Sequence, residues 1–156
     1  MRDIYAPMFD VHLANSAYTA QELLDVLPAH RHQDVRISPP SLAADAFDVP
    51  PRAGARAEML LLTGGDARTR VLAYVGRLSR EKNLGLLVET LAHLMAGEDA
   101  AGERHHLAVA GEGPARALLE RARAQLGGRV HLVGNLPAGA AVRRFIAGAD
   151  LFVHPN

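Results

Sequence analysis

The second half of the chain alternates short apolar runs with patterns of helical spacing. A continuous apolar run at residues 71–75 predicts a strand that is covered on both faces of a sheet. The apolar residues that follow share one face at helical spacing and predict a helix (Leu84, Leu87, Val88, Leu91, Leu94 and Met95). The alternation then continues, with strands expected at 107–110, 130–133 and 151–154 and helices at 115–126 and 138–147.

Short loops join these elements, which favours right-handed βαβ units and therefore a parallel sheet. The predicted fold class is α/β with a doubly wound sheet, and we expect its strands in the order 3-2-1-4, counted from residue 71. Ligands of such sheets bind beyond the carboxyl ends of the strands, where the strand order reverses. We therefore expect a ligand crevice between the ends of the first and fourth strands.

The first forty residues hold a shorter α/β pattern. We expect strands at 9–14 and 35–38 and a helix at 17–27, which Asn15 and Ser16 can cap. Two strands and one helix cannot close a core of their own. Residues 1–40 are therefore predicted to be the tail of one domain, and residues 69–156 to form an incomplete second domain.

Prolines and glycines mark the segment between these two parts. Residues 41–68 show no sustained periodicity and include Pro50, Pro51, Gly64 and Gly65. This composition predicts a linker with one short helical turn at 57–62.

Composition narrows the classes of function. The chain has 17 Lys and Arg against 17 Asp and Glu, so its net charge is zero and nucleic acid is not an expected partner. The absence of cysteine excludes disulfides and thiolate metal sites. No apolar run reaches the roughly 18 residues of a membrane-spanning helix, and the N-terminus lacks an apolar signal core, so we expect a cytoplasmic protein.

The eight histidines are the remaining candidates for metal ligands. His30 and His32 lie in a polar turn, whereas His105 and His106 would point to opposite faces of a strand, because successive strand side chains alternate. The sequence pattern places no carboxylate beside either histidine pair that could complete a set of metal ligands. We therefore expect no metal site.

The loop after the first strand of the sheet carries the most informative charges. Gly76 lets the backbone approach a ligand, and Arg77 and Lys82 flank a loop that opens onto a helix N-terminus. A planar guanidinium and an ammonium suit the oxygens of adjacent phosphates, so one interpretation is a diphosphate site. The other is a solvated loop in which Arg77 or Lys82 pairs with Glu81, worth about 0–1 kcal/mol. Lys82 is the only lysine of the chain, which slightly favours the first interpretation.

A glycine-rich turn, Gly111-Glu112-Gly113-Pro114, follows the second strand and opens a helix. It matches the first two glycines of a dinucleotide-binding fingerprint, but Arg116 stands where the third glycine belongs and no acidic residue ends the next strand. A nicotinamide dehydrogenase is therefore not expected. A tight turn and a loop that lines the crevice both stay open as interpretations of Gly111, Glu112 and Gly113.

Several short motifs occur in a characteristic order along nearly the whole chain. They are Asp10–Ser16, Gly76–Asn83, Gly111–Pro114, Val130–Gly134 and Ala149–Pro155. Together they resemble the retaining glycosyltransferases of family 4, also called glycosyl transferases group 1. This resemblance implies the GT-B fold, which has two Rossmann-like domains. Residues 1–40 would be the tail of the N-terminal, acceptor-side domain, and residues 69–156 part of the nucleotide-sugar-binding domain.

The resemblance also implies roles for particular residues. In that family an Arg and a Lys after the first strand of the second domain bind the donor's diphosphate, which maps to Arg77 and Lys82. The backbone after the third strand meets the nucleobase, which maps to Asn135 and Leu136. The glycine-rich turns are expected to line the donor site with them (Gly76, Gly111, Glu112 and Gly113).

The function implied by the resemblance is transfer of a hexose, with retention, from a nucleotide-diphosphate sugar to a sugar, lipid or small-molecule acceptor, without a metal or cofactor. The family's acidic motif would follow Asn156, and its glycine-rich loop and cleft histidine would precede Met1, so we expect an interior fragment that is inactive alone. The alternative is a non-catalytic nucleotide- or phosphate-binding module. Peripheral contact with a membrane stays open for a lipid-linked acceptor.

Overall fold

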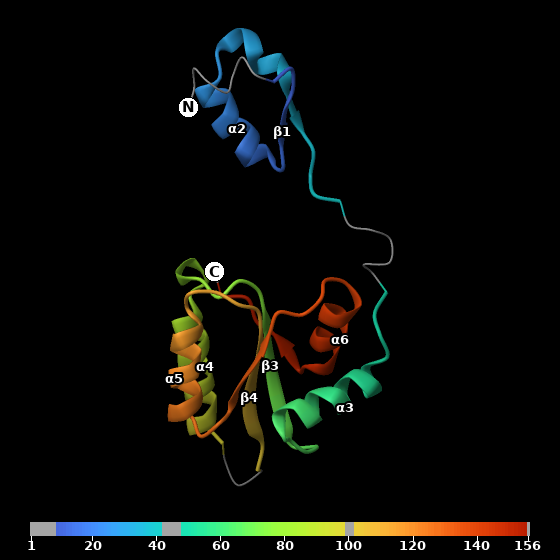
Figure 1. Ribbon diagram of the computed structural model, residues 1–156, viewed down its shortest axis with the longest axis vertical. Coiled ribbons are helices and arrows are strands. Elements are labelled where there is room, and N and C mark those ends of the chain that lie inside the picture. The colour runs from blue at the N-terminus through green and yellow to red at the C-terminus, as the bar shows by residue number, and fades with distance from the viewer. Residues whose placement is uncertain (1–8, 42–47, 99–101, 156) are drawn as a thin grey trace. The chain divides into compact units, whose positions relative to one another are not determined.

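The computed structural model describes residues 9–41, 48–98 and 102–155. The chain forms two compact units, Met1–Asp45 and Ala46–Asn156 (Figure 1).

The first unit is a single βαβ arrangement. Its elements are β1 (His12–Ala14), α2 (Ala17–Val26), the 3-10 helix η2 (Ala29–Asp34) and β2 (Val35–Ile37). The two strands are parallel, with His12 opposite Val35. Ser16 caps α2, because its Oγ accepts a hydrogen bond from the Thr19 backbone N–H at 3.1 Å. The predicted strands and helix are confirmed, although β1 begins three residues later than expected.

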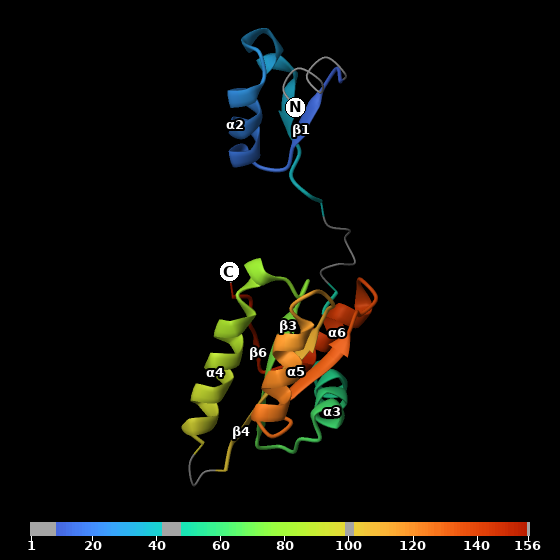
Figure 2. The ribbon, with the colours of Figure 1, turned by 60° about the vertical axis from the view of Figure 1, so that its left-hand side comes forward.

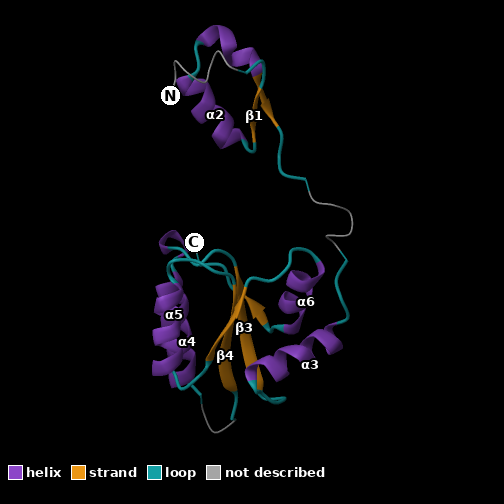
Figure 3. Cartoon of the chain, viewed as in Figure 1, coloured by secondary structure: helices purple, strands orange, loops and turns teal. Residues whose placement is uncertain are grey.

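The second unit is built on a four-stranded parallel sheet (Figure 3). Its strands are β3 (Thr69–Val75), β4 (Arg104–Ala110), β5 (Val130–Gly134) and β6 (Leu151–Phe152). They lie in the order β5-β4-β3-β6, which confirms the predicted 3-2-1-4 order. The pairing of β3 with β4 is continuous from Thr69 opposite Arg104 to Val75 opposite Ala110. The carboxyl ends of the two central strands therefore finish level with each other.

Helices cover both faces of this sheet. They are α3 (Arg52–Thr63), α4 (Leu84–Ala96), α5 (Arg116–Gln125) and α6 (Ala140–Gly148), and a short 3-10 helix, η4 (Arg80–Lys82), lies in the loop before α4. Helices α4 and α5 lie on one face and α3 and α6 on the other (Figures 1 and 2). The core beneath α4 and α5 consists of large, fully buried side chains that include Tyr74, Leu87, Leu91, Leu107 and Leu119. The core beneath α3 and α6 is smaller and centres on Met59, Val71 and Ala108.

Helix α3 corrects the expectation of a linker at 41–68, of which residues 42–47 lie outside the described residues. The segment 52–63 is a helix of the second unit rather than a connection with one short turn. Its buried residues, Ala55, Met59 and Thr63, recur every four positions and face α6 and the sheet. The two helices approach closely, since a Cβ added at Gly148 would lie 2.4 Å from the Ala55 carbonyl oxygen. Burial of these three residues stabilises α3 although it contains Gly54, and glycine within a helix is unfavourable.

An arginine and an aspartate fasten α3 to the sheet. Arg56 Nη1 lies 2.8 Å from Asp150 Oδ2, and the same oxygen accepts a hydrogen bond from the Val71 backbone N–H at 2.8 Å. Arg56 also donates to the carbonyl oxygens of Thr69 and Gly148, at 2.5 and 3.2 Å. The ion pair is largely buried, with side-chain exposures of 18% for Arg56 and 23% for Asp150. It therefore joins α3 to the start of β3 and to the junction of α6 with β6.

Two histidines stack on the α3–α6 side of the sheet. The rings of His106 and His131 lie 5.1 Å apart, and His106 Nδ1 is 2.9 Å from His131 Nε2. One of these nitrogens must donate and the other accept, so the pair fits neutral imidazoles. Burial, and then the neighbouring His131, lower the pKa of His106 to about 4. Burial also lowers the pKa of His131. His105, one residue earlier on β4, lies near Glu98 instead, at 3.5 Å.

This pair should make the second unit sensitive to acid. Between about pH 6.5 and pH 4 the unfolded chain binds a proton at His106 that the folded chain excludes, so stability falls as the pH falls. The expected loss in the free energy of unfolding approaches about 3 kcal/mol at the lower end. Urea titrations across this range should show the loss in the unaltered chain and a weaker one in His106→Gln. The exposed His93 of α4 offers the control, since His93→Gln should keep the full pH dependence. Equal slopes for His106→Gln and the unaltered chain would contradict this assignment.

Candidate functional site

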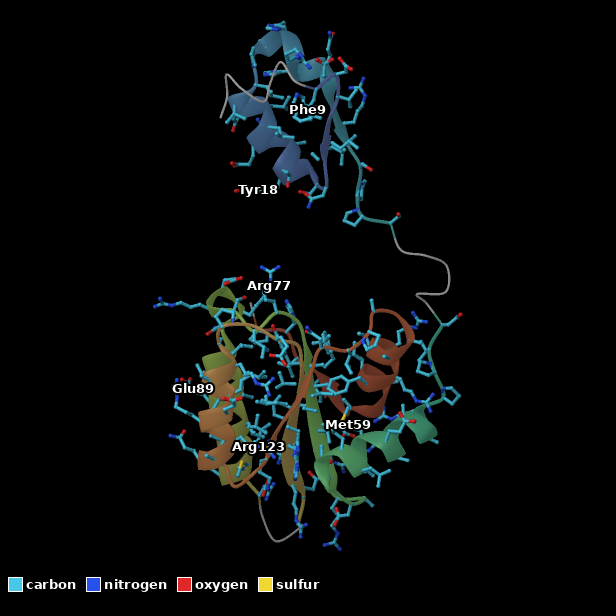
Figure 4. All side chains as sticks on the ribbon, in the orientation of Figure 1. Phe9, Tyr18, Met59, Arg77, Glu89 and Arg123 are labelled. Atoms are coloured by element: carbon cyan, nitrogen blue, oxygen red, sulfur yellow. The ribbon has the colours of Figure 1, made fainter. Side chains whose placement is uncertain are left out.

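Three loops meet at the carboxyl end of the sheet. The loop after β3 begins at Gly76, whose N–H donates to the Ala110 carbonyl oxygen at 3.0 Å. The loop after β4 begins at Gly111, whose N–H donates to the Gly134 carbonyl oxygen at 2.8 Å. Hydrogen bonding of the sheet thus continues beyond the last strand residues and aligns the loops. Arg77 lies at this end of the second unit (Figure 4).

The turn at Gly111–Pro114 packs directly against the loop after β3. A Cβ added at Gly111 would lie 1.9 Å from the Gly76 carbonyl oxygen, and the φ of Gly111 is +143°. Two further backbone bonds connect the loops, from Leu78 N–H to the Glu112 oxygen at 2.9 Å and from Ala115 N–H to the Leu78 oxygen at 2.8 Å. The turn therefore opens α5 and also supports the backbone that carries Arg77.

Arg77 and Lys82 flank one short loop, as the sequence predicted. Arg77 is exposed immediately beyond β3, and Lys82 is half-buried at the end of η4. The Lys82 N–H donates to the Ser79 carbonyl oxygen at 3.1 Å, which closes this turn. Asn83, with a φ of +45°, then leads into α4. Two cations and the N-terminus of a 13-residue helix therefore share one loop, an arrangement that favours an anion.

A buried serine holds a carboxylate in the same loop. Ser79 is 7% exposed, and its Oγ donates to Glu81 Oε1 at 2.6 Å. This hydrogen bond is the largest influence that lowers the pKa of Glu81, and the charges of Arg77 and Lys82 lower it further. The loop therefore carries its own anion near the two cations. The sequence suggested Glu81 only as a surface partner of Arg77 or Lys82 and gave no role to Ser79.

Tyr74 is the second residue of this region that the sequence analysis missed. Its side chain is fully buried, and its hydroxyl donates to the Arg77 carbonyl oxygen at 3.0 Å. Its ring stacks on His154 after β6, with centroids 6.0 Å apart and planes at 6°. The available signal was a tyrosine inside an otherwise apolar strand, since a buried tyrosine hydroxyl needs a hydrogen-bond partner.

The structure separates the other predicted residues. Glu112 pairs with Arg116 at 2.5 Å, and its carboxylate lies beside Gly134, where an added Cβ would be 3.3 Å from Oε1. The Glu112 carboxylate thus lies at the end of β5, and Asn135, which follows β5 in the chain, is exposed. The side chain of Leu136, by contrast, lines a cavity of about 290 Å³ on the α3–α6 side of the sheet. The roles predicted for these residues stay predictions.

A second cavity lies beside the loop that carries the two cations. It has a volume of about 430 Å³ and is bounded by the start of α4 and the start of α5, with Ser79, Arg80 and Asn83 in its wall. Arg77 and Lys82 do not line it. This half-open cavity is therefore not the space that the two cations would share with a ligand.

Two kinds of site are absent from the described part of the chain. Within residues 9–41, 48–98 and 102–155, no three His, Asp or Glu side chains come together in a way that could hold a metal ion. In the same residues, every helix is too short or too polar to cross a membrane.

Solved glycosyltransferases share this fold. WaaG, described as a glycosyltransferase involved in lipopolysaccharide biosynthesis, matches 92% of the chain with a TM-score of 0.67 and 21% identity. A glycosyltransferase from Rickettsia africae matches 98% of it, with a TM-score of 0.70 and 14% identity. The pneumococcal O-GlcNAc transferase GtfA, solved with UDP and GlcNAc, matches 96%, with a TM-score of 0.58 and 16% identity. The architecture is that of the GT-B glycosyltransferases.

The chain spans only part of these proteins, namely 37% of WaaG, 40% of the Rickettsia africae enzyme and 26% of GtfA. Its family is nevertheless shown by sequence. The family model described as Glycosyl transferases group 1 matches residues 69–156, which is more than half of the chain. The chain belongs to this family. A comparison with curated proteins gave no significant match.

Proposed function

We propose that this chain supplies the donor site of a glycosyltransferase of the retaining family 4 type. The donor would be a nucleoside-diphosphate sugar, and the acceptor a sugar, a lipid or a small molecule. One observation carries the proposal: Arg77 and Lys82 flank a single loop at the carboxyl end of β3, in a chain that belongs to glycosyl transferases group 1. GtfA, which shares this fold, was solved with UDP, and this supports a nucleoside diphosphate as part of the donor.

The chemistry that this loop would support is departure of a diphosphate. As the bond between the sugar's anomeric carbon and the phosphate oxygen breaks, negative charge builds on that oxygen. The Arg77 guanidinium can donate two hydrogen bonds to phosphate oxygens, whereas the Lys82 ammonium acts as a compact charge. In front-face transfer the acceptor oxygen bonds to the same face of the carbon and its proton passes to the leaving phosphate. Such a step requires no nucleophile from the protein.

A second candidate function is a nucleotide- or phosphate-binding module without catalysis. It is favoured by the second unit, which is compact and has a buried core on both faces of its sheet. Such a unit can hold the loop after β3 in place without a catalytic partner. The two functions share the diphosphate site and differ in whether a sugar is transferred.

Calorimetric titration of the chain with UDP, GDP and ADP tests the shared site. We expect at least one of them to bind, and Arg77→Ala to weaken that binding about 10- to 100-fold, because each charge-assisted hydrogen bond contributes strongly. Arg80→Ala is the matched control, since Arg80 is an exposed arginine of the same loop. Failure of all three nucleotides to bind would contradict both functions. In a complete glycosyltransferase that contains this chain, acceptor-dependent release of nucleoside diphosphate from a nucleotide sugar would then separate the transferase from the module.

A further inference from the structure

Tyr74 connects the core of the second unit with the loop that carries the cations. The residue lies in β3, two positions before Gly76, and its ring belongs to the buried cluster beneath α4 and α5. Its hydroxyl reaches past Gly76 to the carbonyl oxygen of Arg77, 3.0 Å away. A Cβ added at Gly76 would lie 2.9 Å from this hydroxyl oxygen. Glycine at position 76 therefore leaves the space through which Tyr74 reaches the Arg77 backbone.

The same ring also borders the expected crevice. It stacks on the imidazole of His154, which follows β6, and β6 is the neighbour of β3 in the sheet. Tyr74 thus contacts residues that follow both strands between which a ligand of this sheet would bind. Burial raises the pKa of the Tyr74 hydroxyl, so it stays a hydrogen-bond donor at neutral pH.

Packing of the Tyr74 ring in the core does not require its hydroxyl group. A phenylalanine ring would fill the same core space and could stack on His154 in the same way. What the oxygen adds is one bond to the backbone of Arg77, the residue proposed to bind the diphosphate. Arg77 is exposed at the surface, so packing does little to restrict the direction of its side chain.

We propose that Tyr74 is a positioning residue of the diphosphate site, which fixes the Arg77 backbone and thereby directs the Arg77 guanidinium toward the ligand. This inference rests on the proposed function, because it assigns Tyr74 to a site whose ligand is a diphosphate. Beyond the proposed function, the affinity of that site for a diphosphate would then depend on Tyr74, a side chain that does not contact the ligand.

The test is binding of inorganic pyrophosphate to the full chain, measured by calorimetry. Tyr74→Phe should weaken binding about three- to tenfold, the effect typical of losing one buried hydrogen bond. Its melting temperature should fall modestly, because the same hydrogen bond also contributes to stability, and binding is therefore measured well below that temperature. Tyr18→Phe removes a hydroxyl from a residue that is 75% exposed in the first unit, and it should leave both quantities unchanged.

A double-mutant cycle shows whether Tyr74 acts through Arg77. In the Arg77→Ala background, Tyr74→Phe should have no further effect on affinity, because the group that it positions is gone. Equal losses in both backgrounds would overturn the positioning role, as would unchanged affinity of Tyr74→Phe in the unaltered background. Either result would leave the diphosphate site intact. If the unaltered chain bound no pyrophosphate, both the site and the role of Tyr74 would be overturned.

Discussion

Replacing Gly111 with alanine is expected to lower the free energy of unfolding of the second unit by about 3–4 kcal/mol. The new Cβ would lie 1.9 Å from the Gly76 carbonyl oxygen, so the loops after β3 and β4 would have to separate. The φ of +143° adds backbone strain, since residues with a side chain rarely adopt it. Separation would also break the bond from the Gly76 N–H to the Ala110 oxygen.

Gly127 provides the matched control for this prediction. It also has a positive φ, +59°, but a Cβ added there would meet nothing within 4 Å. Gly127→Ala should therefore cost only the strain of a left-handed alanine, about 1–2 kcal/mol. Urea unfolding followed by circular dichroism measures both variants. If the two substitutions proved equally costly, the crowding at Gly111 would not be what determines its effect.

Removing either predicted cation should slow sugar transfer by about 100- to 1,000-fold. Arg77→Ala and Lys82→Ala each remove a positive group from the loop in which charge is proposed to develop on the leaving diphosphate. The rate is measured in a complete glycosyltransferase that contains this chain, as release of nucleoside diphosphate from the donor at saturating acceptor. Arg77→Lys keeps the charge but loses the bidentate geometry, so it should recover part of the rate.

Arg80→Ala is again the control, because it removes a positive charge from the same loop without removing a predicted site residue. It removes an exposed arginine between the two predicted cations and should change turnover by less than about tenfold, as expected of a charge that contacts no reacting group. Turnover near that of the unaltered protein in both Arg77→Ala and Lys82→Ala would remove these residues from the mechanism. Folding of each variant is verified by its melting temperature.

The sheet was predictable because its central strands are buried on both faces. Such strands leave continuous apolar runs, as at 71–75, and glycines and prolines mark the turns that follow. Helix α3 was not predictable in the same way. Its buried stripe consists of Ala55, Met59 and Thr63, whereas the conspicuous Leu61 and Leu62 are exposed. The buried face of α3 becomes evident only from its contact with α6.

At the site, residue types and strand ends predicted which charges share a loop, but not how that loop is held. Arg77 and Lys82 stand out because they follow a buried strand and precede a helix. The hydrogen bonds of Tyr74 and Ser79 depend on where the backbone turns after Gly76. Such geometry arises from packing between loops that lie far apart in the chain, which a local pattern does not contain.

The match to the family model begins at residue 69, whereas the second compact unit of the structure begins at Ala46. A shortened protein starting at Thr69 would lack α3, and with it Met59 and the guanidinium that neutralises Asp150. One side of the sheet would then be partly bare, with an uncompensated carboxylate at its rim. Such a truncation should express poorly and self-associate, so recombinant boundaries belong upstream of Arg52.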